Sequence, residues 1–480
     1  MRILKRILIA LLVILILLAI AAWWILRGDA ADVPFDQVTG TDPTLAEPDP
    51  QTIPTVKIAK PVGWKAGEAP VAAKGLTVTR FAEGLEHPRT MLALPNGDIL
   101  VTEANAPERI VAGGGGITNF IAGILFAQAG AAVPSPNKLV LLQDKDGDGV
   151  AETRAVLRSD LDSPSGLAWR DGKLYLANHD EVVEFNYELG TTTLTGTPRK
   201  LMDLPGAGNH WSRNLLLNDD GTLLYVAIGS ASNIGDGGMQ LEQGRAAIDE
   251  IDLKTGEWRP FAAGLRNPNG LDWNPWTGEI WTTVNERDQL GSDLVPDYLT
   301  NVPVGAQYGW PWLYWGKNID ERVTAPMPNF LSEYTRKPVY AMGPHVAALG
   351  LTFTGAGNRM GPAFGQGAFV ARHGSWNRKP PAGYDVVFVN FDNRGNPTGK
   401  PVPVLTGFLN KDGTTKGRPT WVAWDKTGAL LVSDDTGGII WRVIAPGAPA
   451  NPAPTRPKDE PRPSYRGLLP PQPGVQGIEG

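Results

Sequence analysis

One of only five histidines in this 480-residue chain lies among residues that could carry out proton transfer. His210 follows Asn209 and stands three residues before Arg213, at the start of a strand-turn-strand pattern. An imidazole has an ordinary pKa of about 6.5 and can accept a proton near neutral pH. A guanidinium can bind a carboxylate through two hydrogen bonds. We therefore predict that His210 is a catalytic base; the alternative is a structural histidine that joins two neighbouring units of the fold.

A hairpin pattern that recurs along the chain must position this histidine. Each copy has a glycine-bearing turn followed by alternating apolar residues, as in NGDILVTEA from Asn96 and DGTLLYVAIGS from Asp220. Repetition of one supersecondary unit at this scale is typical of a radial array. The sequence predicts an all-β fold, a six-bladed β-propeller over residues 75–445. The turn glycines are Gly97, Gly172, Gly221, Gly278, Gly367 and Gly428.

Polar residues follow the second strand of most of these hairpins. In a propeller such positions gather around one central depression, which is a favourable place for a ligand. Taken singly, each of these residues could equally be a solvated loop residue. The ring of them predicts a binding site made of Glu103, His179, 285–288, His373, Asp434 and Asp435.

Six short motifs occur in order along the body of the chain. They are NHWSR (209–213), GLRNPNGL (264–271), VNERD (284–288), QYGWP (307–311), ARHGSWNR (371–378) and GRP (417–419). With these motifs the chain resembles the soluble glucose and sorbosone dehydrogenases that use pyrroloquinoline quinone (PQQ), and it is most similar to the L-sorbosone dehydrogenase branch. The resemblance implies the same six-bladed propeller. It also implies oxidation of a sugar or sugar-derived aldehyde by hydride transfer to bound PQQ, with His210 as the general base.

The resemblance further implies which residues hold the cofactor. Arg266 and Asn267 match a cofactor-binding pair in which Arg266 is also catalytic, and Arg418 matches an arginine that binds a cofactor carboxylate. A calcium ion on the quinone is implied near the loop 285–293. The remaining cofactor positions fall on His345, His373 and Arg378, and the calcium positions fall on Glu286, Asp288 and Asp293, with backbone carbonyls as further ligands.

Some positions depart from the family's pattern. Asn209 stands where the glucose enzymes carry an aspartate, and Pro164 stands where they carry a glutamine. Arg266 has an alternative role as the salt-bridge partner of Glu286 or Asp288. Two other functions therefore stay open: a cofactor-free propeller binding module, and a metal-dependent propeller lactonase or hydrolase. The metal of such a hydrolase would be bound by Glu103, Asn285 and Asp434.

The N-terminus predicts a membrane anchor. Basic residues at Arg2, Lys5 and Arg6 precede an uninterrupted apolar run at 7–26, which is long enough to cross a bilayer as a helix. Residues 1–27 are predicted to be an uncleaved signal-anchor of the inner membrane, with the body on the periplasmic side. A membrane quinone or a cytochrome would then accept the electrons. The Pro-rich segments 28–74 and 446–480 are predicted to be an extended linker and a tail.

Composition excludes several kinds of chemistry. The net charge of −6 and the lack of basic runs argue against nucleic acid as a partner. Because the chain has no cysteine, thiolate metal sites and cysteine nucleophiles are impossible. The DKDGDG segment at 144–149 has the alternating carboxylates of a calcium loop. We interpret it as a hairpin turn, with a peripheral calcium site as the alternative.

Overall fold

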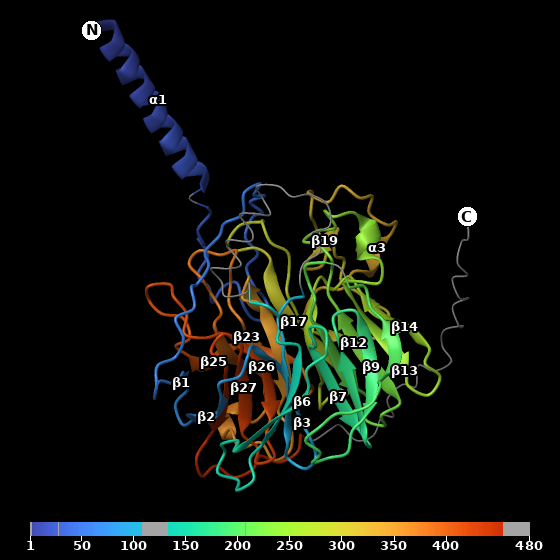
Figure 1. Cartoon of the computed structure of the whole chain (residues 1–480). Coiled ribbons are helices and arrows are strands. Elements are labelled where there is room, and N and C mark those ends of the chain that lie inside the picture. The colour runs from blue at the N-terminus through green and yellow to red at the C-terminus, as the bar shows by residue number, and fades with distance from the viewer. Residues whose placement is uncertain (1, 27, 108–132, 207, 455–480) are drawn as a thin grey trace.

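The computed structural model describes residues 2–26, 28–107, 133–206 and 208–454. An apolar helix, α1 (Arg2–Leu26), precedes a body made almost entirely of strands (Figure 1). The helix is long and apolar enough to cross a membrane, with a mean hydropathy of 2.9 over Ile3–Ile20. Membrane anchors and signal peptides share this property.

The strands form six four-stranded antiparallel blades, which confirms the predicted β-propeller. Blade 1 holds β3 (Pro88–Ala93), β4 (Ile99–Glu103), β5 (Lys138–Gln143) and β6 (Thr153–Arg158). Blade 2 holds β7 (Gly166–Arg170), β8 (Lys173–Ala177), β9 (Glu181–Asn186) and β10 (Arg199–Asp203). Blade 3 holds β11 (Arg213–Leu217), β12 (Leu223–Ile228), β13 (Ala247–Asp252) and β14 (Trp258–Ala263).

The second half of the chain completes the ring. Blade 4 holds β15 (Pro268–Trp273), β16 (Ile280–Val284), β17 (Pro296–Val302) and β21 (Tyr340–Pro344). Blade 5 holds β22 (Ala348–Phe353), β23 (Gly367–Arg372), β24 (Asp385–Phe391) and β25 (Pro397–Thr406). Blade 6 holds β26 (Pro419–Trp424), β27 (Leu430–Asp434), β28 (Ile439–Ile444) and β2 (Thr77–Glu83). Short elements lie between and beside the blades: β1 (Val71–Ala72), β18 (Ala306–Gln307), β19 (Leu313–Tyr314), β20 (Asn318–Ile319), α3 (Leu331–Tyr334) and the 3₁₀ turns η1 (Met239–Glu242) and η2 (Pro362–Phe364).

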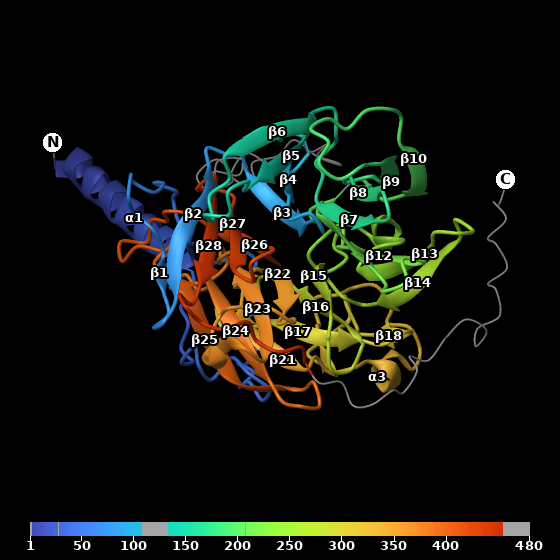
Figure 2. The same cartoon turned by 90° about the horizontal axis from the view of Figure 1, so that it is seen from below.

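The first strand of each blade faces the centre of the ring. The strands β3, β7, β11, β15, β22 and β26 contact one another in a closed cycle, and Figure 2 shows the blades arranged around them. Blade 6 takes its outer strand from the N-terminal side of the chain, because β2 pairs with β28 from Thr77↔Ile444 to Glu83↔Ile439. This pairing closes the ring because it joins the two ends of the propeller within one blade.

The predicted turn glycines lie where the repeat places them, with one exception. Gly97, Gly172, Gly221 and Gly428 adopt positive φ between the first and second strands of their blades, as does Gly278. Gly367 instead opens β23, where a Cβ atom would collide with the carbonyl oxygen of Val389. Its lack of a side chain serves a close approach of two strands, not a turn.

The 144–149 segment forms the hairpin between β5 and β6. The Asp144 carboxylate accepts hydrogen bonds from the backbone N–H groups of Gly147 and Gly149, which confirms the turn. Ligand atoms of Asp144, Asp146, Asp148 and Glu152 all lie within 4.8 Å of one another. The calcium alternative therefore remains a prediction.

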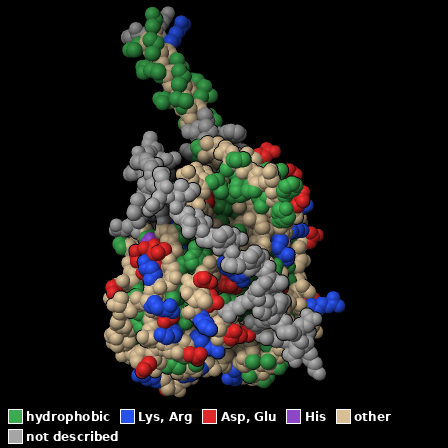
Figure 3. All heavy atoms as spheres, turned by 90° about the vertical axis from the view of Figure 1, so that its right-hand side faces the viewer, with side chains coloured by type: hydrophobic (Ala, Val, Ile, Leu, Met, Phe, Trp, Pro, Cys, Tyr) green, Lys and Arg blue, Asp and Glu red, His purple; other side chains and the backbone are tan. Residues whose placement is uncertain are grey.

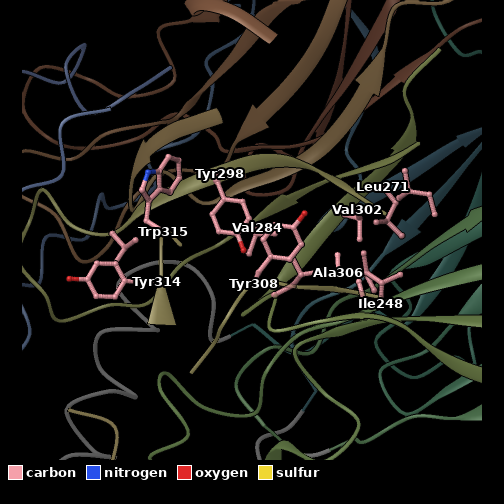
Figure 4. Close-up of a cluster of buried hydrophobic side chains, with 14 of the residues drawn as sticks. Ile248, Leu271, Val284, Tyr298, Val302, Ala306, Tyr308, Tyr314 and Trp315 are labelled. Atoms are coloured by element: carbon pink, nitrogen blue, oxygen red, sulfur yellow. The ribbon is translucent and has the colours of Figure 1, made fainter. Parts of the chain in front are cut away.

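A hydrophobic cluster fills the space between blades 3 and 4 (Figure 4). Ile248 of β13, Leu271 of β15, Val284 of β16 and Tyr298 of β17 are all buried in it. Burying a side chain of this size stabilises a fold by about 1.5–3 kcal/mol. The cluster thus fixes the two blades whose loops carry His210 and Arg266.

Asp249 follows Ile248 on β13, where it is buried and makes stability depend on pH. Burial raises its pKa from 3.8 to about 7, so the folded state holds a proton that the unfolded chain loses above pH 4. The resulting stability is present at low pH and is lost as pH rises through 7. We expect Asp249→Asn, which is neutral at every pH, to raise stability at pH 8 by on the order of 2–4 kcal/mol relative to wild type, and by less than about 1 kcal/mol at pH 4. Thermal unfolding at the two pH values measures this, and an equal change at both would contradict it.

The 28–74 segment differs from the extended linker that its composition predicts. Val38 and Ala59 are fully buried, and Phe35 packs beneath the guanidinium groups of Arg372 and Arg378. We call residues 28–64 the strap. Backbone hydrogen bonds attach it to blades 4 and 5, including a bridge between Gly40 and Ala341. The linker prediction is wrong because these few apolar side chains find partners far away in the sequence. Of the predicted tail, residues 455–480 lie outside the described residues.

Candidate active site at the propeller mouth

The predicted site residues lie at one end of the propeller. Some precede the innermost strand of a blade: His210 before β11, Arg266 before β15, His345 before β22 and Arg418 before β26. Others lie between the second and third strands, in the connections 285–295 and 373–384. Because strands alternate in direction within a blade, both kinds of connection emerge at the same end. We call this end the mouth.

His210 is held in one tautomer. Its Nδ1 lies 2.8 Å from the carbonyl oxygen of Ser230 and 3.0 Å from the hydroxyl of the same residue. A carbonyl oxygen only accepts, so Nδ1 carries the hydrogen and Nε2 is left as an acceptor. Burial, reinforced by the positive charge of Arg266, lowers the pKa of His210 to about 3. The imidazole is therefore neutral at physiological pH, which is the state a general base requires.

Arg213 supports the loop that carries His210. Its guanidinium donates hydrogen bonds to the carbonyl oxygens of His210, Ser212 and Pro205. The side chain is fully buried. Arg213 therefore fixes the shape of the loop and does not offer a free cation to a substrate.

A glycine that the sequence analysis missed brings His210 next to Asn267. A Cβ atom at Gly229 would lie 2.6 Å from the Cβ of His210 and would collide with Oδ1 of Asn267. That Asn267 oxygen is buried and has no hydrogen-bond partner among the described residues. The only sequence signal is a glycine directly after the apolar strand LLYVAI, which by itself does not distinguish a site from a turn.

Arg266 adopts the alternative role that the sequence left open, as the ion-pair partner of Asp288. Its Nη2 lies 3.1 Å from Oδ2 of Asp288 and 2.9 Å from Oδ1 of Asn233. The other guanidinium nitrogens donate to the carbonyl oxygens of Asn233, Asn285 and Glu286. Arg266 could therefore bind a cofactor, as predicted, only if a cofactor atom replaced one of these hydrogen-bond partners.

His345 pairs with the same aspartate from the other side. Its Nδ1 lies 3.3 Å from Oδ1 of Asp288, and its Nε2 lies 3.0 Å from the carbonyl oxygen of Gly291. Both partners are acceptors, so both ring nitrogens donate and His345 is an imidazolium. Although burial opposes the charge, the hydrogen bond to Asp288 raises the pKa of His345 overall. Because both ring nitrogens are engaged, His345 positions Asp288 and Arg266 in this structure and does not project a free group toward a ligand.

The acidic residues predicted as calcium ligands already have partners. Glu286 accepts from Arg287, and Asp288 accepts from Arg266 and His345. Asp293 accepts from Arg378 through one oxygen and from the backbone N–H groups of Asp32 and Val33 through the other. Arg378 and Asp293 thus attach the strap, and their predicted roles as cofactor and calcium ligands remain predictions.

On the opposite side of the mouth, His373 belongs to a second charged group. Its Nε2 lies 2.8 Å from Oδ2 of Asp435, which also binds Arg89 at 2.6 Å. Burial lowers the pKa of His373. Burial opposes the charge of Asp435, but its hydrogen bond with His373 and the charge of Arg89 lower the pKa of Asp435 far below its ordinary value. The Arg89 guanidinium lies over the ring of Trp211, 5.4 Å from its centre. Because Trp211 adjoins His210 in the chain, the two charged groups border one shared mouth.

Among the buried arginines described at the mouth, Arg418 makes the fewest hydrogen bonds through its guanidinium group. Its guanidinium stacks over Tyr384 and makes one long hydrogen bond, 3.5 Å, to the carbonyl oxygen of Ala59. Its Nε is buried and lacks a hydrogen-bond partner within the described part of the chain. Unused donors on Arg418 and an unused acceptor on Asn267 fit a ligand that carries both carboxylates and a polar ring, as PQQ does.

Comparison with known proteins agrees with this fold. A PQQ-dependent sugar dehydrogenase from Hypocrea jecorina is 24% identical over 432 residues, covering 78% of this chain and 89% of that protein. Among solved structures, a Trichoderma reesei protein of carbohydrate-active enzymes family AA12 matches with a TM-score of 0.62, 23% identity, and coverage of 78% of this chain and 97% of that one. The PQQ domain of Coprinopsis cinerea pyranose dehydrogenase matches with a TM-score of 0.60, 21% identity, and coverage of 81% and 100%.

The fold and these relatives place the chain among the propeller oxidoreductases. Within that class, the TrAA12-like family profile matches residues 125–303 and 327–445. Because these segments make up more than half of the sequence, the chain belongs to the TrAA12-like family.

Proposed function

We propose that the chain oxidises a sugar or sugar-derived aldehyde with PQQ bound at the mouth, and that His210 is the general base. The observation that carries this proposal is the fixed tautomer of His210, which leaves Nε2 as a neutral acceptor on a residue that lies near Asn267 and Arg266. When bound, PQQ would supply the electrophilic carbonyl that accepts a hydride. His210 would take the proton of the hydroxyl group that is oxidised.

The remaining residues would bind and orient. Arg418 would pair with a carboxylate of the cofactor, and Asn267 would fix one edge of its ring system. Arg266 would face the reacting centre, while Asp288 and His345 hold it in place. Calcium, ligated by oxygen atoms of the 285–293 loop, is part of the proposal because it would strengthen the electrophile.

The chain would act at a membrane. We infer that α1 stays attached as a signal-anchor and that the propeller lies on the periplasmic side. The electrons would then pass to a membrane quinone or a cytochrome.

Reconstitution tests the proposal directly. The full chain is incubated with calcium and PQQ, and the absorption of bound cofactor and the reduction of a dye are followed with aldoses and aldehydes. Bound-cofactor absorption and substrate-dependent dye reduction are expected. No spectral change at high PQQ concentration would overturn the proposal, and hydrolysis of lactones without PQQ would favour the hydrolase alternative.

Replacing Arg418 should weaken cofactor binding. A charge-assisted hydrogen bond contributes about 1.5–3 kcal/mol, so we expect Arg418→Ala to raise the dissociation constant of PQQ by roughly 10- to 100-fold. Absorption titration measures this. Arg442→Ala is the matched control, because Arg442 is a half-buried arginine of blade 6 that pairs with Asp425 in the hairpin at the opposite end. Equal affinities of the two variants would contradict the role of Arg418.

A further inference from the structure

The strap begins immediately after the apolar helix and is attached to the mouth from its first residues. Within the strap, Gly28 packs against Thr55, and the backbone N–H of Asp29 donates to the hydroxyl of Thr55 at 2.7 Å. The Asp29 carboxylate accepts a hydrogen bond of 2.6 Å from the backbone N–H of Ser292, in the mouth connection between β16 and β17. The chain leaving the helix therefore joins the propeller at its mouth.

Two further bonds make this attachment independent of any single residue. Oδ2 of Asp293 accepts from the N–H groups of Asp32 and Val33, at 2.6 and 2.9 Å. Oδ1 of the same carboxylate binds Arg378 at 2.9 Å. Since Asp293 is buried, these bonds are shielded from water and from screening by salt.

The length of chain between helix and mouth sets a limit on their separation. Helix α1 ends at Leu26, and the first residue bonded to the mouth is Asp29, whose carboxylate accepts from the N–H of Ser292. Three residues span at most about 11 Å when fully extended. The polar headgroup layer outside the roughly 30 Å hydrocarbon core is about 5–8 Å thick on each side. If the apolar run ends at the edge of the hydrocarbon, this rim of the mouth lies in or directly above the headgroups.

The surface at this end has side chains that suit such a position. Large apolar side chains are exposed on the mouth connections, on the strap and on the 318–334 insertion, which is joined to the mouth through the ion pair of Asp320 with Arg287. Phe330 is 63% exposed and Trp376 is 43% exposed. Figure 1 shows α3 and β19 at the end from which α1 leaves, and Figure 3 shows hydrophobic side chains gathered near that end. The set is Ile53, Leu241, Ile319, Met327, Phe330 and Trp376.

We propose that the mouth of the propeller faces the bilayer and that this apolar rim contacts the lipid headgroup layer. The inference rests on the anchoring part of the proposed function. Aromatic side chains such as Trp376 are favoured at the membrane interface because their rings are amphipathic. A lipid-dissolved quinone would reach the mouth directly in this orientation, whereas a soluble cytochrome would be hindered. Soluble sugars would enter laterally, between the rim and the lipid.

Site-directed fluorescence can test the orientation, because the chain has no cysteine of its own. Full-length Phe330→Cys and Trp376→Cys carry a fluorophore in phosphatidylcholine and phosphatidylglycerol vesicles whose headgroups bear a nitroxide quencher. Matched controls are Leu189→Cys and Trp258→Cys, which replace exposed apolar residues in or next to connections at the opposite end. We expect several-fold stronger quenching of the mouth labels. Equal quenching of both ends, or stronger quenching of the controls, would overturn the proposal.

Two further measurements separate this inference from the function on which it rests. The mass of the chain recovered from cells shows whether α1 is retained, and removal of the helix would overturn both the anchoring and the orientation. A 20-residue Gly/Ser insertion before Gly28 would lengthen the tether by roughly 25 Å on average. It should lower the quenching of the mouth labels, and unchanged quenching would overturn the tether argument. Binding of PQQ by the same protein is independent of these results.

Discussion

His210→Ala is expected to lower turnover by roughly 10²- to 10⁴-fold while the cofactor still binds. The imidazole is the neutral acceptor beside Asn267, and alanine leaves no group there that could take a proton from a substrate. PQQ would be held mainly by Arg418 and the neighbouring amides, so its dissociation constant should change only a few-fold. Dye reduction measures turnover, and absorption titration in the same preparation measures cofactor binding.

His179→Ala serves as the control for this experiment. Although the sequence places His179 in the predicted polar ring, it lies between β8 and β9 at the mouth end of blade 2, near Asp162 and Asp180 and outside the two charged groups described above. Its replacement should leave turnover near the wild-type value. If His210→Ala retained full turnover, or lost turnover only because PQQ no longer bound, His210 would be a ligand or a structural residue and the proposed base would be elsewhere.

Much of the fold could be predicted from the sequence because it follows from local chemistry. A turn glycine and two apolar strands form a hairpin wherever they occur, and their recurrence predicts the blades. The strap could not be predicted in this way. Its prolines and polar residues are typical of a linker, and only long-range partners such as Arg372 and Ala341 explain why Phe35 is covered and Gly40 is bridged.

The sequence predicted which residues gather at the mouth, but among their pairings it anticipated only that of Arg266 with Asp288. Motifs placed His210, Arg266 and Arg418 in connections that the blade topology brings to one mouth. Which charges neutralise one another depends on how loops from different blades meet, and that is not local. The ion pair between Asp288 and His345 joins residues 57 positions apart. From the sequence, Asp288 was predicted to bind calcium and His345 to bind the cofactor.

These pairings also separate the residues that hold the site from the residues available to a ligand. Asp288 is bound on both sides, by Arg266 and by His345, and its environment lowers its pKa. In contrast, Arg418 and Asn267 keep buried atoms without partners in the described structure. A bound cofactor would form hydrogen bonds with Arg418 and Asn267. The ion pairs of Asp288 would keep the surrounding loops rigid.

Asp288→Ala is therefore expected to cause a large loss of stability. Removing this carboxylate would leave the guanidinium of Arg266 and the imidazolium of His345 close together and uncompensated. Breaking a buried ion pair by removing one partner costs about 3–5 kcal/mol. Urea unfolding of the cofactor-free protein at pH 7 measures the change in free energy. Asp160→Ala is the control, because this exposed partner of Arg158 should contribute less than about 1 kcal/mol.

The pH dependence distinguishes an ion pair from simple packing. Because the folded-state pKa of His345 lies above its ordinary value of 6.5, its pairing adds stability that is present below pH 6.5 and is lost as pH rises through the raised value. Asp288→Asn keeps the shape of the side chain and removes the charge. The difference in stability between wild type and this variant should therefore shrink as pH rises from 6 to 9. A difference that stayed constant over this range would show that His345 is not charged in the folded protein and that Asp288 acts through its pH-independent ion pair with Arg266.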